Sequence, residues 1–379
     1  MTEYLSRILS PFGISSFLSH FQRRRHFHIG RNCPGYYDDF LKVGDVDGFL
    51  QSERLPAVFF NVVKEGTRYS LEEWSRMETS VRGACLVAVP ERLFALYSEG
   101  ATLVLNQADR SFPSLSTLCR TLSAELGFPV HANVYVTPDR SSGFARHADN
   151  HEVLVIQIAG SKRWQLYIDD NTVEEIDLAC GDLLYLPRGL AHSAKAQDGD
   201  SIHVTLGLTP VYGFQLVQEL AATALRTSGF QQPMPPRCAE NDARQEFEAE
   251  FLEQLRNLLA QTQPSALIDA ASQSLLESQS QGWPGRLSDL RLHNDITAKT
   301  IVRRRPGIIV SVRNEGKFLC VAFSDKRVIV AAFLGDALSL ILGEREFATS
   351  ELKGFIAEAG KVKLVAEFVR AGLLQIVHI

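Results

Sequence analysis

Two histidines and an aspartate constrain the fold of this 379-residue chain more than any other feature. His147 and Asp149 are two residues apart, and His192 follows much later. Two imidazoles and one carboxylate can hold one face of a divalent metal and leave positions open for oxygen chemistry at iron(II). In an extended segment, residues two apart project to the same side, so His147 and Asp149 can share one metal. The third ligand must then come from another strand.

The segments around this pair are typical of β-strands. A bare His-x-Asp occurs often by chance, so the prediction of a metal site depends on its surroundings. Segments 133–138, 152–158 and 162–167 are rich in β-branched and aromatic residues. Segment 181–192 has a turn, a short apolar strand and a second Pro/Gly turn that delivers His192. This pattern favours a double-stranded β-helix of the cupin or jelly-roll type.

The strand expected at 162–167 directs a lysine the same way as apolar side chains. Lys162 shares its face with Trp164 and Leu166. A lysine directed into a barrel is costly unless a negative group meets it, so this pattern predicts an anionic ligand inside. The equal alternative is a lysine whose stem lies on the rim while its ammonium group reaches water.

A row of polar side chains is expected beside the metal pair. Asn133, Tyr135 and Thr137 share one face of their predicted strand. Their hydroxyl and amide groups could bind a polar ligand. Ordinary cross-strand pairing would explain the same row.

Taken together, these segments resemble the JmjC-type, cupin-like ribosomal oxygenases, a family of iron(II)- and 2-oxoglutarate-dependent protein hydroxylases. The motifs run in the family's order and at its spacing. They are Asn133–Pro138, the pair His147 and Asp149, Val153–Gln157, Lys162–Tyr167, Gly181–Pro187 and Ala191–Ser193.

The resemblance implies a role for each matching residue, with O2 as the oxidant. It implies that Lys162 meets the distal carboxylate of 2-oxoglutarate, while Asn133 and Tyr135 line the cosubstrate pocket. Thr205 lies where the family often has a small hydroxyl residue on a late strand. The implied iron(II) ligands are His147, Asp149 and His192.

One position departs from the family's pattern. Many relatives have a large residue between the first histidine and the aspartate, whereas this chain has Ala148. This difference affects which substrate is expected, and it does not change the predicted metal ligands. His151 is a residue type that can also bind a metal, but it lies two residues past Asp149 without a second ligand of its own. It is therefore expected to be an ordinary strand residue or a residue near the substrate.

The length and composition predict a chain of several domains with a large hydrophobic core. Hydrophobic residues make up 45% and charged residues 22%. The net charge of -5 and the pI near 6.1 give no global attraction to nucleic acid or an anionic membrane. No apolar run approaches the length of a membrane span. The six cysteines form no C-x-x-C pair, which favours a reducing, cytoplasmic location; they are Cys33, Cys85, Cys119, Cys180, Cys238 and Cys320.

The first 212 residues are expected to form one α+β catalytic domain. Residues 1–18 are amphipathic and precede a basic run at 23–26. A transit peptide is one interpretation, but a helix that opens the domain is favoured because the resemblance begins at about Leu9. A further helix is predicted at 114–126, where apolar residues recur at helical spacing.

Residues 213–281 are expected to be helical, because Ala, Leu, Gln and Glu dominate. Within them, an apolar stripe predicts an amphipathic helix whose face must pack against something. The catalytic domain could cover it, but the resemblance favours a homodimer. The stripe consists of Phe247, Phe251, Leu252, Leu255, Leu258 and Leu259.

Residues 282–379 are expected to form a winged-helix-like domain. Strands are predicted at 307–312 and 318–323, and helix, turn, helix and closing strand at 349–379. Such a domain often binds DNA, and the run 303–305 could contact phosphate. A three-arginine run is more often a solvated turn, so DNA binding is not expected.

Three functions follow from these observations. The favoured one is an oxygenase that hydroxylates a protein side chain, by resemblance a His or Arg of a ribosomal protein. A small peptide or metabolite is an alternative substrate, because a fold does not define its substrate. The third is a non-catalytic cupin sensor whose winged helix binds DNA.

Overall fold

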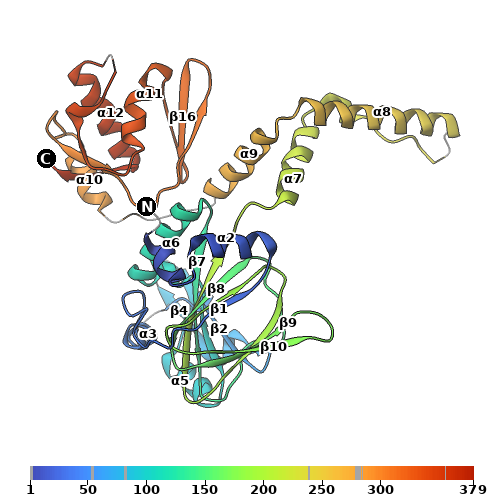
Figure 1. The fold of residues 1–379 in the computed structure, drawn as a ribbon, viewed down its shortest axis with the longest axis vertical. Helices are drawn as coiled ribbons and strands as arrows, with labels where there is room; N and C mark the ends of the chain where they lie inside the picture. The colour runs from blue at the N-terminus through green and yellow to red at the C-terminus, as the bar shows by residue number, and fades with distance from the viewer. Residues whose placement is uncertain are drawn as a thin grey trace. The chain divides into compact units, whose positions relative to one another are not determined.

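The computed structural model describes residues 3–52, 55–80, 83–237, 240–277, 283, 285–354 and 356–379. The chain divides into two units, Met1–Pro210 and Val211–Ile379 (Figure 1). The predicted boundary between 281 and 282, the residue Cys238 and the residue Phe355 of the predicted C-terminal helix all lie outside the described residues. Within the described parts, no helix has both the length and the apolar character that a membrane crossing needs.

Unit 1 contains the predicted jelly roll, made of a large and a small antiparallel sheet. The large sheet has the order β1-β11-β8-β13-β7-β6-β2-β3, and the small sheet the order β10-β9-β12. The large-sheet strands are β1 (Phe27–Ile29), β2 (Phe60–Lys64), β3 (Thr67–Arg68), β6 (Thr102–Leu105), β7 (Val130–Thr137), β8 (Glu152–Ala159), β11 (Leu183–Leu186) and β13 (Ser201–Leu208). The small-sheet strands are β9 (Lys162–Tyr167), β10 (Val173–Leu178) and β12 (Ala191–Ala196).

The central strands of the large sheet are buried along their length. All of β13 and nearly all of β8 are inaccessible to water. Branched apolar side chains suit such strands because they pack on a pleated surface with both faces covered. One face of this sheet joins the main core, and the other packs on Trp164 and Leu166 of the small sheet. Apolar side chains from both sheets therefore pack together in the interior of the barrel.

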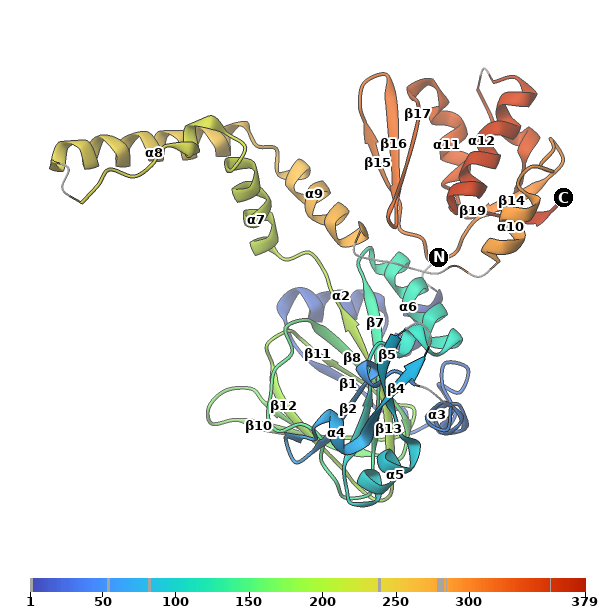
Figure 2. The same ribbon diagram turned by 180° about the vertical axis from the view of Figure 1, so that it is seen from behind.

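Helices cover the outside of the large sheet. The predicted helix at 114–126 is α6, which begins at Pro113 and ends before Gly127, a residue in the left-handed conformation. The N-terminal segment packs Leu9 and Phe17 into the main core, as the interpretation of a domain-opening helix requires. In Figures 1 and 2, α2 and α5 lie at opposite ends of the strands. The helices are α1 (Glu3–Leu9), α2 (Ile14–Arg23), α3 (Val43–Leu50), α4 (Leu71–Trp74), α5 (Pro90–Ser98) and α6 (Pro113–Leu126), and a hairpin joins β4 (Ser75–Ser80) to β5 (Gly83–Ala88).

Unit 2 begins with three helices, α7 (Gly213–Ala224), α8 (Asn241–Gln261) and α9 (Pro264–Glu277). Helix α7 packs against α9, whereas α8 contains no buried residue. Phe251, Leu252 and Leu259 of the predicted amphipathic stripe are exposed. Phe230 packs against Phe251, so the stripe is covered only in part within its own unit.

The remainder of unit 2 has its own apolar core. Strand β16 (Phe318–Phe323) lies where it was predicted, between β15 (Ser311–Asn314) and β17 (Lys326–Ala331). A second sheet has the order β18-β14-β19, from β14 (Ile301–Arg304), β18 (Phe347–Ala348) and β19 (Leu374–His378). The helices are α10 (Arg286–Leu292), α11 (Gly335–Ile341) and α12 (Glu358–Ala371).

Two predicted elements in this unit were misplaced. The strand expected at 307–312 starts only at Ser311, because Gly307 adopts a positive φ of 79° and the following Ile308 turns into the core. The helix expected from residue 349 is only a short 3₁₀ turn over Thr349–Glu351. The last helix and the closing strand are present as α12 and β19.

Each arginine of the run 303–305 is paired with an acid. Arg303 lies 3.3 Å from Glu346, Arg304 lies 3.7 Å from Glu344, and Arg305 is buried against Asp289. These carboxylates neutralise the cations that a phosphate would need.

A buried carboxylate joins the N-terminal segment to the jelly roll. Asp182 accepts hydrogen bonds from the backbone N–H groups of Arg31, Asn32 and Ala179 at 2.6–2.9 Å, and from His28 at 3.2 Å. Burial opposes ionisation of Asp182, but these hydrogen bonds outweigh it and hold its pKa below the usual value. The carboxylate therefore stabilises the fold in its charged form.

We predict that Asp182→Ala lowers the free energy of unfolding by about 3 kcal/mol near pH 7, because it leaves buried N–H donors without a partner. Urea unfolding would measure the loss, with Asp170→Ala at an exposed site as the control. Because the folded pKa is depressed, the contribution exists at neutral pH and is lost as the pH falls through it. A difference between variant and wild type that does not shrink below about pH 4 would contradict this assignment.

Candidate metal centre

The structure brings the three predicted ligands together. The ligand atoms of His147, Asp149 and His192 all lie within 4.8 Å of one another. His192 Nε2 is 3.7 Å from a carboxylate oxygen of Asp149. Among the described residues this is the one group of three or more such side chains that could hold a metal ion.

Backbone pairing holds the two histidines side by side. The N–H of His147 donates to the carbonyl of His192 at 3.1 Å, and the N–H of His192 donates back at 2.8 Å. Gly189 N–H donates to the Asp149 carbonyl at 2.9 Å. Segment 147–149 therefore lies beside the start of β12. The turn that precedes β12 holds the far end of this segment through Gly189.

Each imidazole is oriented by its own backbone. Nδ1 of His147 lies 2.9 Å from the carbonyl of Ala145, and Nδ1 of His192 lies 2.9 Å from the carbonyl of Leu190. A proton on Nδ1 completes these hydrogen bonds and leaves both Nε2 atoms as lone-pair donors. Burial lowers the pKa of His192, which favours the neutral, ligating form. The donor set therefore fits a divalent metal with open coordination positions.

A tight turn positions the segment that carries His147. Glu65 N–H donates to the Ser142 carbonyl at 3.1 Å, and Gly66 N–H donates to the Gly143 carbonyl at 2.7 Å. Gly66 has a φ of 83°, and a Cβ at this residue would lie 2.7 Å from the Cβ of Ala145. Glycine is required here because its missing side chain lets the turn approach the segment so closely.

The three side chains line one cavity of about 40 Å³ between the two sheets. Hydrophobic side chains form part of its wall, and polar groups gather around its inner end. The lining residues are Thr102, Tyr135, Gly143, Phe144, His147, Asp149, Val153, Lys162, Trp164, Leu186, His192, Ala194, His203 and Thr205.

Lys162 points into this cavity rather than to the rim. Its side chain is only 3% exposed, and its Nζ donates to Thr137 Oγ1 at 2.9 Å. Thr102 Oγ1 donates to the same hydroxyl at 3.1 Å. Burial without an acidic partner lowers the pKa of Lys162 to about 7. The structure thus favours the interpretation in which this lysine meets an anionic ligand.

The other predicted pocket residues lie in different surroundings. Tyr135 and Thr205 line the cavity, and burial raises the pKa of Tyr135 so that its hydroxyl keeps its proton. Asn133 is not among the lining residues. Its amide oxygen accepts a hydrogen bond from the backbone N–H of Gln107 at 2.9 Å, which connects β7 to the preceding loop.

His203 and Trp164 are lining residues whose place in the site was not predicted from the sequence. His203 is 3% exposed and stacks on Tyr135 with ring centroids 4.6 Å apart. Burial, with Lys162 and His192 nearby, lowers the pKa of His203 well below its usual value. Trp164 was predicted only as an apolar residue. Parity could have indicated His203, because it is two residues before Thr205 on one strand.

Two of the side chains that line the cavity have a buried polar atom without a hydrogen-bond partner among the described residues. In the described part of the chain, Nδ1 of His203 and Nε1 of Trp164 are buried without a hydrogen-bond partner. Buried polar groups are normally paired, and an unpaired one requires an explanation. Because both residues line the cavity beside Lys162, the site fits a polar, anionic cosubstrate at the metal.

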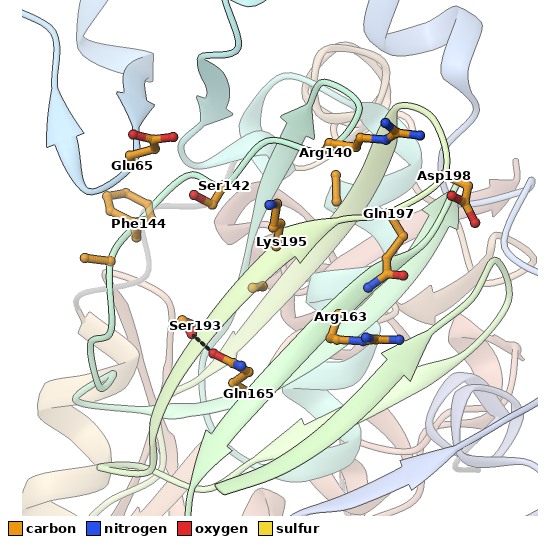
Figure 3. A pocket seen from close by; sticks show the side chains of 13 residues that line it. Glu65, Arg140, Ser142, Phe144, Arg163, Gln165, Ser193, Lys195, Gln197 and Asp198 are labelled. Carbon is orange, nitrogen blue, oxygen red and sulfur yellow. Dashed lines mark hydrogen bonds between the residues drawn. The ribbon is translucent and has the colours of Figure 1, made fainter.

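A larger groove of about 620 Å³ lies beside the metal cavity. Its floor is the side of β9 and β12 that carries Arg163, Ser193 and Lys195, and its wall is the segment that leads to His147 (Figure 3). Phe144 and Ala194 line both the groove and the metal cavity.

We predict that Gly66→Ala weakens binding of a divalent metal on the order of tenfold, because the added methyl group displaces the segment that carries His147. Gly199→Ala is the matched control, since Gly199 has a φ of 97° but no atom within 4 Å of an added Cβ. Calorimetric titration with Mn²⁺ would compare the two variants. Equal affinities would show that this turn does not position the ligand.

Comparison with known proteins identifies the catalytic unit. Residues 105–216 match the JmjC domain. The chain is 30% identical over 229 residues to "Bifunctional lysine-specific demethylase and histidyl-hydroxylase NO66" of Drosophila yakuba, covering 54% of this chain and 32% of that protein. It is 29% identical over 220 residues to "Ribosomal oxygenase 1" of Rattus norvegicus, covering 52% and 36%. The aligned region therefore spans about a third of these relatives' length.

Solved structures show the same fold. Escherichia coli YcfD, described as a ribosomal oxygenase and solved with cobalt and 2-oxoglutarate, has a TM-score of 0.57 at 14% identity, covering 96% of this chain and 98% of that one. Another structure of YcfD has a TM-score of 0.61 at 14% identity, covering 96% and 97%. This likeness confirms the predicted cupin-like fold with mixed helix and sheet. Residues 105–216 therefore match a JmjC domain, and the chain is similar in sequence to proteins described as ribosomal oxygenases, as the resemblance in its sequence predicted.

Proposed function

We propose that this chain is an iron(II)- and 2-oxoglutarate-dependent oxygenase that hydroxylates a protein side chain. The observation that carries the proposal is the metal triad in one cavity with a buried, anion-seeking lysine. A dicarboxylate that chelates the metal needs open coordination positions there. It also needs a separate cation for its far carboxylate. When bound, the iron and 2-oxoglutarate would supply the oxidation of a C–H bond by dioxygen.

The protein's own residues bind and orient these groups. His147, Asp149 and His192 hold the metal through atoms that their backbone contacts leave free. Lys162 holds the distal carboxylate, and Thr137 orients its ammonium group. No residue has to accept a proton from the substrate, so the site needs no catalytic base.

Tyr135, Thr205 and His203 add polar groups along the inner wall of this site. Trp164 contributes a buried N–H at the same wall. We assign these residues to cosubstrate binding. Asn133 supports the loop beside them and forms a side-chain hydrogen bond with Tyr135.

The proposed substrate is a His or Arg side chain of a ribosomal protein. Support comes from the relatives, which are described as a histidyl-hydroxylase and as ribosomal oxygenases. Ala148 is exposed between the two ligands, where a small residue leaves room beside the metal for a bulky partner.

Unit 2 is proposed to serve assembly and substrate positioning rather than DNA binding. The exposed residues Phe251, Leu252 and Leu259 on α8 support a homodimer through the helical region. A winged-helix-like arrangement of residues 282–379 is supported by helices α10 to α12 around the β18-β14-β19 sheet. DNA binding is disfavoured because the arginines of 303–305 are paired with acids.

Binding of 2-oxoglutarate should depend on the proton of Lys162. Burial lowers its pKa to about 7, so affinity should fall as the pH rises above about 7 and the cation is lost. Lys162→Ala should raise the dissociation constant tenfold or more, on the order of the 1.5–3 kcal/mol of a charged hydrogen bond.

Titration calorimetry of the Mn²⁺-loaded protein would measure these affinities from pH 6 to about 9. Lys162→Arg is the matched control, because arginine keeps its charge throughout and should remove the pH dependence. An unchanged affinity in Lys162→Ala would show that another group holds the anion.

The function is tested by succinate formation with iron(II), ascorbate and air, with and without a ribosomal-protein extract. We expect turnover that rises with the extract, is absent in Asp149→Ala, and adds one oxygen atom to an extract protein as seen by mass spectrometry. Turnover without stimulation would favour a peptide or metabolite substrate. No turnover under either condition would favour the sensor instead.

A further inference from the structure

Two imidazoles lie together near the metal centre but outside its cavity. His131 of β7 and His151, which directly precedes β8, have ring centroids 5.2 Å apart. Both residues are half-buried, and neither lines the metal cavity. His151 follows the ligand Asp149 by two residues, so the pair lies close to the metal without belonging to its ligand set.

A glycine makes room for both rings. Gly207 of β13 is paired in register with His131. A Cβ at Gly207 would lie 2.3 Å from Cε1 of His131 and 2.8 Å from Cδ2 of His151, so any other residue there would push the imidazoles away. A glycine inside a strand often marks a place where another group approaches closely. Here the approaching groups are the two imidazoles.

The imidazole pair lies on the face of the large sheet that also carries the metal cavity. Tyr135 and Thr205 line the cavity, and side chains two residues apart along a strand share a face. His131 is four residues from Tyr135 on β7, and Gly207 is two residues from Thr205 on β13. Both therefore continue the inner wall of the site beyond the cavity.

The cosubstrate is proposed to lie toward the opposite end of this wall. Thr137 of β7 accepts a hydrogen bond from Lys162, the proposed partner of the far carboxylate. With a strand rise of about 3.3 Å per residue, His131 lies about 20 Å from Thr137 along β7. A 2-oxoglutarate molecule held by Lys162 and the metal is too short to reach the imidazole pair. The pair is therefore available to the group that approaches the metal from the other side, which is the substrate.

The two rings carry polar atoms that the protein itself does not use. Nδ1 of His151 lies 3.1 Å from the side-chain oxygen of Asn150. Among the described residues, neither Nε2 of His151 nor the ring of His131 has a hydrogen-bond partner. Apolar side chains would fill the same space without the cost of removing polar atoms from water. The pair is suited instead to a planar side chain with N–H groups, which can stack on the rings and donate to their nitrogens.

We propose that His131 and His151 are substrate-binding residues that hold the side chain of the protein substrate beside the metal, with Gly207 giving them room. The proposal rests on the proposed function, because it needs a protein substrate at this site. It adds the residues that select a planar side chain with N–H groups, a chemistry that histidine and arginine share.

Oxygenation of a ribosomal-protein extract would test this assignment. The full chain with iron(II), ascorbate, 2-oxoglutarate and air would be titrated with the extract, and mass spectrometry would quantify the modified peptide. His131→Phe and His151→Phe each keep a flat ring and remove its nitrogens. We expect each variant to raise the extract concentration for half-maximal rate about tenfold, the effect of one lost hydrogen bond, with a smaller change in the maximal rate.

Further variants complete the experiment. His26→Phe makes the same change at an imidazole that contacts Glu174 and lines neither the groove nor the metal cavity, so it should leave the extract dependence unchanged. His131→Gln and His151→Gln keep a side chain that forms hydrogen bonds and should recover part of the loss. Titration with Mn²⁺ would report the state of the metal site in every variant.

The outcomes separate the two claims. If wild type oxygenates an extract protein and neither phenylalanine variant changes the half-maximal concentration, the imidazoles do not contact the substrate and this inference is wrong. Loss of Mn²⁺ affinity in both the phenylalanine and the glutamine variants would also overturn it, because the rings would then support the metal site. If wild type oxygenates no extract protein, the proposed function fails, and the inference fails with it.

Discussion

The site depends on one pair of backbone hydrogen bonds, those between His147 and His192. They close a segment without regular strand structure onto β12, and so they bring together ligands from distant parts of the sequence. The carbonyls of Ala145 and Leu190 then orient each imidazole. The metal site is thus built mainly from backbone contacts, and the Gly66 turn limits where the segment can lie. Such a site is organised before any ion binds, which lowers the cost of binding.

The interior of the barrel combines this site with groups that would be costly without a ligand. Lys162 is buried without an acid, and Trp164 and His203 have buried polar atoms without a partner among the described residues. These costs are acceptable because the two sheets bury many apolar side chains around the cavity. The same groups would be satisfied when an anionic cosubstrate binds. These buried polar groups therefore point to the chemistry of the ligand.

Strand periodicity and motif spacing were enough to predict the jelly roll and the meeting of His147, Asp149 and His192, but they left the inward and rim positions of Lys162 as equal alternatives. Long-range contacts were not accessible in the same way. The Gly66 turn touches Ala145 across the fold, and no local pattern reveals that approach. Asn133 shares its face with Tyr135, and its amide oxygen accepts a hydrogen bond from the Gln107 N–H, a loop contact that no local pattern reveals. In unit 2, the strand at Ser311 was displaced because Gly307 adopts a left-handed turn. The alternation of residues along a strand therefore predicts on which face a side chain lies, whereas its contacts with distant segments decide which group it binds.

The most direct test of this account is an anaerobic crystal structure of the chain soaked with iron(II) and 2-oxoglutarate. We predict one anomalous peak bound by Nε2 of His147, Nε2 of His192 and the Asp149 carboxylate, with the far carboxylate of the cosubstrate at Lys162. Iron at any other group of residues, or a cosubstrate carboxylate away from Lys162, would contradict the account.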